Sequence, residues 1–169
     1  IFKLAIPSMI GQLISVLYNI VDRIFVGNLP LNGEISLIGV GVCSPIVTLI
    51  TSFAFLVGLG GAPMFSIALG EKNYQKAKKI LSNALLMLIV VSLVLMIVFY
   101  MFSEPILFLF GASEASISYA LDYLHVYLIG TFFSLLTLGL VQYLTAQGES
   151  FKAMLTTIIG CIINVGLDP

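Results

Sequence analysis

Residues 80–102 read ILSNALLMLIVVSLVLMIVFYMF, an apolar stretch without a single charged residue. About 20 such residues are enough to cross the hydrocarbon core of a bilayer as a helix, so this stretch predicts a transmembrane span. The pattern recurs on both sides of it, with apolar segments at about 4–27, 35–70, 117–146 and from 153 to the last residue, 169. The whole chain is 60% hydrophobic and 9% charged, with a mean hydropathy of +1.15. We therefore predict an all-α, polytopic membrane helix bundle with about five transmembrane helices.

The segment at 35–70 is too long for a straight span perpendicular to the membrane. It would measure about 54 Å as one helix, so it must protrude, tilt or bend, and Pro45 and Pro63 offer the bends. Its second half carries a small residue at every fourth position: Ala54, Gly58, Ala62, Ser66 and Gly70. Small residues at this spacing let two helix backbones approach closely, so we predict that this face packs directly against a neighbouring helix.

Charged residues between the apolar segments are divided by sign. One set of connections and ends carries the lysines: Lys3, Lys72, Lys76, Lys78, Lys79 and Lys152, with Glu71 among them. The opposite connections carry Glu34, Glu104, Glu114 and Asp122, and neither lysine nor arginine. Because lysine and arginine favour cytoplasmic loops, we expect a multi-pass protein of the cell inner (plasma) membrane with a cytoplasmic N-terminus. Topology explains the lysine cluster, and binding of an anionic lipid is the alternative.

The stretch 103–116 predicts a connection on the outer side of the membrane. Glu104-Pro105 is expected to end a helix, 106–110 to form a short interfacial piece, and 111–113 to form a turn in which Ser113 caps the next helix. Beyond it, Tyr119, Tyr123 and Tyr127 share one helix face, where an aromatic belt at the interface explains Tyr119 and Tyr123. His125 lies near the same interface, and we interpret it as a structural or lipid-facing histidine.

The two cysteines and the chain ends carry less information. Cys43 and Cys161 both lie inside apolar runs, where we expect small buried hydrophobic residues. The odd number of segments, the opening Ile1 and the ending at Pro169 lead us to expect a fragment of a longer protein.

Two acids lie inside apolar segments, where an ionisable side chain is by default a candidate functional residue. From the presumed cytoplasmic start of their segments, Asp22 lies about 27 Å and Asp168 about 22 Å along an ideal helix, so both reach the outer half of the membrane. Tyr18 and Asn19 share the helix face of Asp22, and Asn164 shares that of Asp168. Such a group of oxygen atoms suits a hard cation or a shared proton.

A simpler interpretation of Asp22 is also open. Asp22-Arg23 could end the first helix at the outer interface, with the Arg23 side chain extending to water. Pro7 lies deep in the same segment, where it removes one backbone hydrogen bond and permits a bend.

Three groups of residues together resemble the bacterial multidrug and toxic compound extrusion (MATE) transporters. The first helix of that family is similar to Ile6-Pro7 followed by YNIVDRIFVG at 18–27. The end of its second helix resembles GLGG at 58–61 and ALGE at 68–71, and its fifth helix resembles AQGE at 146–149 with NVGLDP at 164–169. The resemblance implies about twelve helices in two lobes, of which 1–169 is a partial N-terminal lobe and the C-terminal lobe is missing.

The resemblance also implies roles for individual residues. Asp22 corresponds to the coupling carboxylate, Asn164 and Asp168 to the amide and acid that complete a Na⁺ or H⁺ site, and Tyr18 to a tyrosine one turn below. Pro7 corresponds to the proline at which the first helix bends. Candidate residues of the substrate cavity or its polar network are Asn19, Gln142, Tyr123 and Tyr127. No cofactor is implied beyond the coupling ion.

The function implied is that of a secondary antiporter that exports amphipathic or cationic organic compounds in exchange for Na⁺ or H⁺. The expected partners are the bilayer and small amphipathic molecules; the net charge of −1 gives no indication of nucleic acid. We do not expect an enzyme, because no metal-binding histidine spacing, nucleophile elbow or phosphate loop is visible. One alternative is a lipid-linked saccharide flippase, although such proteins line their cavities with arginine and the chain has only Arg23. A non-transporting structural membrane protein is another.

Overall fold

The computed structural model describes residues 2–27 and 33–167, except for the side chains at 3, 4, 22, 25, 26, 33, 34 and 164–167. The described residues form helices and short connections, without a strand. The helices are α1 (Phe2–Gly27), α2 (Gly33–Gly70), α3 (Tyr74–Met101), α4 (Ser103–Leu109), α5 (Ile117–Ala146) and α6 (Ser150–Leu167). In this part of the chain, α2, α3 and α5 are long and apolar enough to cross a membrane. The predicted all-α membrane bundle is confirmed.

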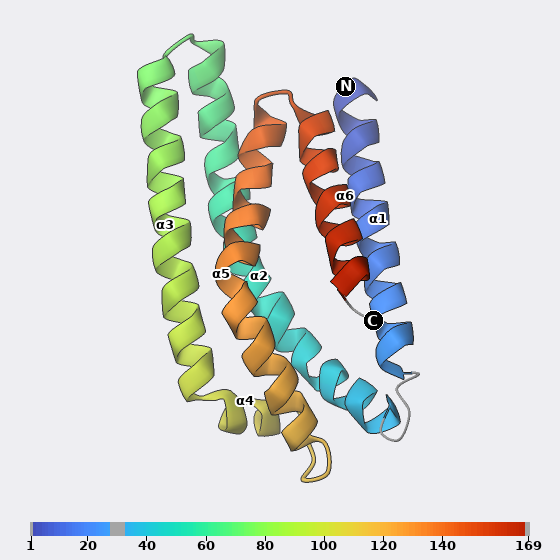
Figure 1. The fold of residues 1–169 in the computed structure, drawn as a ribbon. Coiled ribbons are helices and arrows are strands. Elements are labelled where there is room, and N and C mark those ends of the chain that lie inside the picture. The colour runs from blue at the N-terminus through green and yellow to red at the C-terminus, as the bar shows by residue number, and fades with distance from the viewer. Residues whose placement is uncertain (1, 28–32, 168–169) are drawn as a thin grey trace.

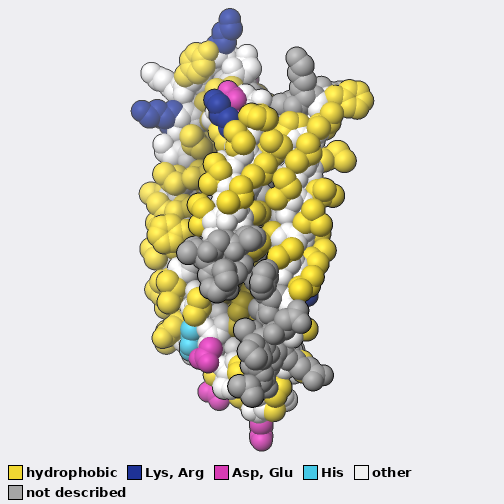
Figure 2. Space-filling model, turned by 45° about the vertical axis from the view of Figure 1, so that its right-hand side comes forward, with side chains coloured by type: hydrophobic (Ala, Val, Ile, Leu, Met, Phe, Trp, Pro, Cys, Tyr) yellow, Lys and Arg dark blue, Asp and Glu magenta, His cyan; other side chains and the backbone are white. Residues whose placement is uncertain are grey.

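The long helices alternate in direction. Figure 1 shows α1, α3 and α6 running one way and α2 and α5 running the other. Helices α2, α3 and α5 pack together as one group, and α1 and α6 pack along each other as a second. The N-terminus therefore lies at the same end as the α2–α3 and α5–α6 connections, which carry the lysines, as Figure 2 shows for one face of the molecule. The predicted separation of basic and acidic ends is present in the fold.

The small-residue face of α2 packs against α5, as predicted. A Cβ atom added at Gly58 would lie 2.7 Å from Cγ of Gln142 and 3.0 Å from the carbonyl oxygen of Gly139. One and two turns from Gly58, Ala54 is fully buried and the hydroxyl of Ser66 donates to the carbonyl of Ala146 at 3.0 Å. The two helices run parallel, so the close contact continues along much of their length.

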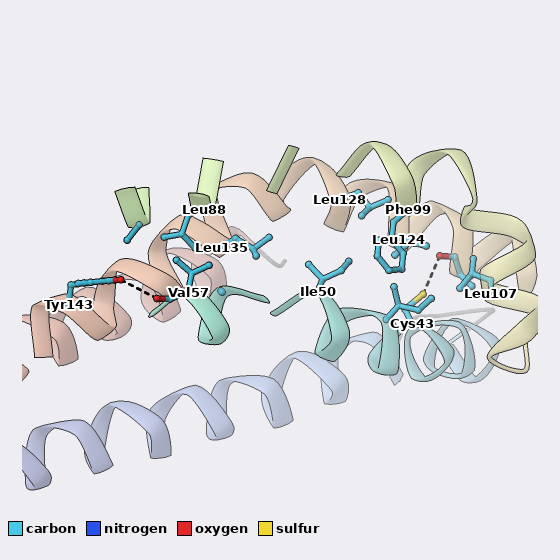
Figure 3. Close-up of a cluster of buried hydrophobic side chains, with 14 of the residues drawn as sticks. Cys43, Ile50, Val57, Leu88, Phe99, Leu107, Leu124, Leu128, Leu135 and Tyr143 are labelled. Atoms are coloured by element: carbon cyan, nitrogen blue, oxygen red, sulfur yellow. Dashed lines mark hydrogen bonds between the residues drawn. The ribbon is translucent and has the colours of Figure 1, made fainter. Parts of the chain in front are cut away.

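The core lies between α2, α3 and α5 and consists of aliphatic side chains with few polar atoms (Figure 3). Ile50, Leu88, Leu128 and Leu135 are almost completely buried there. Cys43 is fully buried, as expected, and its thiol donates a weak hydrogen bond to the carbonyl of Ala120 at 3.4 Å. Cys161 is only partly buried, so the same expectation does not hold for it.

One predicted helix end is wrong. Glu104-Pro105 does not end a helix: both residues lie in the first turn of α4, where proline needs no hydrogen-bond partner and an acidic side chain faces the positive end of the helix dipole. Helix α3 starts at Tyr74, before its apolar part, because the side chain of Asn73 caps it by accepting from the Lys76 amide at 3.0 Å. Hydropathy marks where a helix enters the membrane and does not mark where the helix begins.

One other expectation about this connection is confirmed. Helix α4 matches the predicted short piece at 106–110. The expected cap at Ser113 is wrong, because the residue that precedes α5 is Ser116. Ser113 lies in the turn before it, where its hydroxyl accepts from the Ser116 amide at 3.3 Å while the Ser116 hydroxyl accepts from the Ser113 amide at 3.1 Å. This reciprocal pair satisfies two backbone donors at once. Helix α2 changes direction along its length, and both Pro45 and Pro63 lie inside it (Figure 1).

Candidate cation and substrate site

The candidate site is built on the parallel pair α1 and α6. A Cβ atom added at Gly11 would lie 3.7 Å from Cα of Met154, which fixes how the two helices are aligned. The same number of residues separates Gly11 from Asp22 on α1 and Met154 from Val165 on α6. Val165 is the residue after Asn164. The backbones of Asp22 and Asn164 therefore lie at about the same level on two adjacent helices.

The side chains that would complete the site lie outside the described residues. This applies to the side chains of Asp22 and Asn164 and to the whole of Asp168. The grouping of these three residues around a proton or a Na⁺ ion therefore stays a prediction, supported by the α1–α6 alignment. In the described part of the chain, no group of three or more histidine, cysteine, aspartate or glutamate residues could hold a metal ion.

The described polar residues of α1 make different contacts. Tyr18 is half-buried. Asn19 is exposed, and its side-chain amide donates to the carbonyl of Ser15 at 2.7 Å, within its own helix. Arg23 donates from Nη2 to the hydroxyl of Ser44 on α2 at 3.1 Å. Arg23 thus connects α1 to α2, a contact that the interpretation of Arg23 as an arginine extending to water did not anticipate.

A crevice of about 480 Å³ separates the ends of α1 and α2 near Arg23. Its walls are mainly apolar, and among the described residues Arg23 is the one charged member of the lining, which consists of Ile20, Arg23, Ile24, Gly27, Leu37, Val40 and Gly41. Apolar walls with a small number of polar groups are typical of sites for small organic molecules.

The four candidate residues of the cavity or polar network do not form one cluster. Tyr123 and Tyr127 stack on each other along α5, with ring centroids 6.4 Å apart and planes inclined by 15°. Gln142 lies about 22 Å further along α5, where it packs against Gly58 of α2. Asn19 belongs to the other helix pair. Helical spacing correctly placed the two tyrosines together, but it could not show which helix each face contacts.

His125 has a structural role, which is one of the two interpretations made from the sequence. Its Nε2 lies 3.3 Å from the hydroxyl of Ser103 on α4, and its ring lies against that of Tyr100 on α3 at 4.7 Å between centroids. The histidine therefore joins three helices at the end of the bundle that carries the acidic residues.

Comparison with known proteins agrees with the fold. Residues 7–169 match the MatE family profile. The chain belongs to the MatE family. The MATE resemblance identified from the sequence is thereby confirmed.

Two kinds of relative support this membership. The multidrug export protein MepA of Staphylococcus haemolyticus is 32% identical over 98% of this chain and 36% of its own length. A crystal structure of MATE in complex with MaD3S superposes with a TM-score of 0.91 at 27% identity, over 99% of this chain and 37% of the other. A crystal structure of MATE in the bent conformation gives a TM-score of 0.89 at 27% identity over the same shares. The chain thus spans little more than a third of the length of these MatE relatives.

Proposed function

We propose that this chain is a partial N-terminal lobe of a two-lobe MATE transporter that exports small amphipathic or cationic organic compounds in exchange for Na⁺ or H⁺. The observation that carries the proposal is the alignment of α1 with α6, which brings Asp22 and Asn164 to one level of two adjacent parallel helices. The name of the staphylococcal relatives, multidrug export protein, supports the substrate class. A transporter rather than an enzyme is also what these relatives indicate.

In the proposed mechanism, Asp22, Asn164 and Asp168 hold the coupling Na⁺ ion or proton, with Tyr18 one turn below Asp22. Carboxylate and amide oxygens are suitable ligands for a hard cation, and a carboxylate can instead take up a proton. Binding of the ion favours one of two conformations of the lobes, and release favours the other, so a gradient of the ion can drive alternating access.

Pro7 is the proposed position at which α1 bends between these conformations. It lies inside α1, where its missing N–H leaves one backbone carbonyl without its usual partner. The bend would move the part of α1 that carries Asp22 relative to α2, and it would change the crevice around Arg23. A solved MATE structure in a bent conformation is consistent with this movement.

The proposed orientation places the N-terminus in the cytoplasm and the protein in the inner membrane. It rests on the lysines that lie with the N-terminus at one end of the bundle, opposite Glu104, Glu114 and Asp122.

The test is Asp22→Asn in the complete transporter. We expect this change to abolish efflux of a cationic dye driven by an imposed Na⁺ or proton gradient, because an amide cannot exchange a proton and binds a cation less strongly than a carboxylate. Expression and thermal unfolding should remain close to those of the unmodified protein. Comparing the two gradients identifies the coupling ion.

Asp122→Asn provides the matched control. Asp122 is an exposed acid at the start of α5, so the same loss of one negative charge should leave efflux unchanged. Efflux at the normal rate in the Asp22 variant would refute the assignment.

A further inference from the structure

A polar stripe runs along one face of α3 at its lysine-rich end. It consists of five exposed residues at intervals of three or four, which place them on a single helix face: Gln75, Lys78, Lys79, Ser82 and Asn83. These residues line a surface crevice of about 290 Å³. Every side chain in the lining can donate a hydrogen bond, and none carries a negative charge.

Two other lysines at the same end of the bundle form ion pairs with glutamates, unlike the two described lysines of this crevice. Lys76 lies 3.5 Å from Glu71, and Lys152 lies 3.1 Å from Glu149, so carboxylates offset both charges. In the part of the chain that the structure describes, neither Lys78 nor Lys79 forms an ion pair. The crevice therefore presents two adjacent positive charges that are open to an anion.

The depth of the stripe follows from the length of α3. Its 28 residues span about 42 Å, about 12 Å more than the hydrocarbon core of a bilayer. Because the charged residues are at the start of α3 and its other end is apolar, the excess belongs to the first two turns. Lys78 and Lys79 then lie at the level of the lipid headgroups, and Ser82 and Asn83 lie at the border of the hydrocarbon layer. An exposed amide at that depth requires a polar partner.

The same face of α3 continues as apolar surface. One and two turns beyond Ser82 and Asn83, Leu86 is 67% exposed, Met87 50% and Val90 52%. A ligand that fits the whole face has an anionic group at one end and a hydrocarbon chain at the other. This pattern matches a phospholipid and does not match a free phosphate ion.

We propose that this face of α3 binds an anionic membrane lipid, with the lipid phosphate between Lys78 and Lys79. Ser82 and Asn83 donate hydrogen bonds to the oxygens below the phosphate, and one acyl chain lies along Leu86 and Val90. The proposal depends on α3 spanning a membrane and does not depend on the transport mechanism, so Asp22→Asn should bind the lipid as well as the unmodified protein does.

The experiment measures lipid binding to the complete purified transporter by native mass spectrometry and by the shift of the thermal unfolding midpoint. The probes are phosphatidylglycerol, phosphatidylcholine and inorganic phosphate. We expect phosphatidylglycerol to bind and raise the unfolding temperature, and the other two to have little effect. The double variant Lys78→Gln/Lys79→Gln should bind phosphatidylglycerol about 30-fold more weakly, since each lysine near a membrane surface contributes about a factor of five.

Lys72→Gln/Lys76→Gln is the matched control, since it removes the same charge from the same end but leaves the crevice intact. This variant should retain phosphatidylglycerol binding within about twofold, and the difference between the two double variants identifies a site. Three outcomes would overturn the proposal. Equal losses in both variants would indicate a diffuse basic surface, unchanged binding in Lys78→Gln/Lys79→Gln would remove the two lysines from the site, and equal stabilisation by inorganic phosphate would indicate an anion site without lipid specificity.

Discussion

At the scale of single residues, Tyr143 connects α5 to α2 from inside the apolar core. It is 2% exposed, and its hydroxyl donates to the carbonyl of Val57 at 3.1 Å (Figure 3). Its ring meets Phe65 edge to face, with centroids 5.5 Å apart, and its hydroxyl occupies the space above Gly61 where another residue would place a side chain. The Tyr143 hydroxyl can therefore approach the backbone of α2 this closely only because residue 61 is glycine.

Tyr143→Phe should lower the free energy of unfolding of the complete transporter by about 1 kcal/mol. The change removes one hydrogen bond and leaves the Val57 carbonyl with one partner fewer, while the ring contact with Phe65 persists. Thermal or denaturant unfolding in a fixed detergent measures the effect. Tyr100→Phe is the control, because the Tyr100 ring is 56% exposed and its contact with His125 does not need the hydroxyl. Equal effects of the two substitutions would contradict the role of the Val57 bond.

At the scale of helices, the contact between α2 and α5 depends on the absence of side chains. Gly58 of α2 lies against Gln142 and against the backbone of Gly139 on α5. The Gln142 side chain can turn away from an added methyl group, but the Gly139 carbonyl cannot. Any side chain at position 58 must therefore push the two helices apart.

Gly58→Ala should destabilise the complete transporter by about 1–3 kcal/mol, as expected for overpacking at a close helix contact. Gly60→Ala, two residues away on α2, meets open space, so the usual gain in helix propensity should make it neutral or stabilising by up to about 1 kcal/mol. Unfolding measurements on the two variants side by side test the argument. Loss of stability of similar size in both variants would mean that glycine at position 58 has no special packing role.

At the scale of the whole molecule, α1 and α6 pack along each other as a pair beside the α2, α3 and α5 group. A Cβ atom at Gly11 would lie 3.9 Å from Cβ of Met154, inside the range of about 3.5–4.5 Å for a disulfide. Gly11→Cys with Met154→Cys should therefore crosslink on oxidation in a background in which Cys43 and Cys161 are replaced by alanine. We expect the crosslink to stop efflux, because α1 can no longer bend at Pro7 independently of α6, and a reducing agent to restore it.

The control for the crosslink moves one cysteine by a single position. Leu155 points about 100° away from Met154 around α6, so Gly11→Cys with Leu155→Cys should crosslink far less. Gel mobility after tryptic digestion measures the crosslinked fraction, and dye efflux is followed in the same samples. A complete Gly11–Met154 crosslink with efflux at the normal rate would show that α1 and α6 move together.

Periodicity and hydropathy predicted most of the fold and one packing face, but they did not predict which side chains form hydrogen bonds between helices. The helical positions of Ala54 and Gly58 indicated a packing face, because the intervals depend only on helix geometry. The bond from Arg23 to Ser44 and that from Tyr143 to Val57 join helices far apart in the chain, and nothing in the local sequence specifies such a partner. Pro105 was misread for a related reason: proline is unfavourable inside a helix but favourable in its first turn, and the sequence does not show which of the two applies.

The candidate site was predictable in part. The spacing of Asn164 and Asp168 and the depth of Asp22 indicated one level in the membrane, and the alignment of α1 with α6 agrees with this for the backbones of Asp22 and Asn164. The candidate polar residues do not lie together, since Gln142 contacts Gly58 and is far from the two tyrosines nearer the start of α5. A polar residue in an apolar helix signals that it has a partner, but the rotation of the helix decides which partner that is.

The pairing of α1 with α6 has a consequence for biosynthesis. In a chain made from the N-terminus at about 5–20 residues per second, α1 is complete roughly ten seconds before α6 emerges from the ribosome. During that interval α1 lacks the helix that covers Gly11, and its apolar side chains must be covered by lipid or by the insertion machinery. The order in which the helices are synthesised therefore differs from the order in which they can assemble, and the proposed site around Asp22 could form only after α6 has entered the membrane.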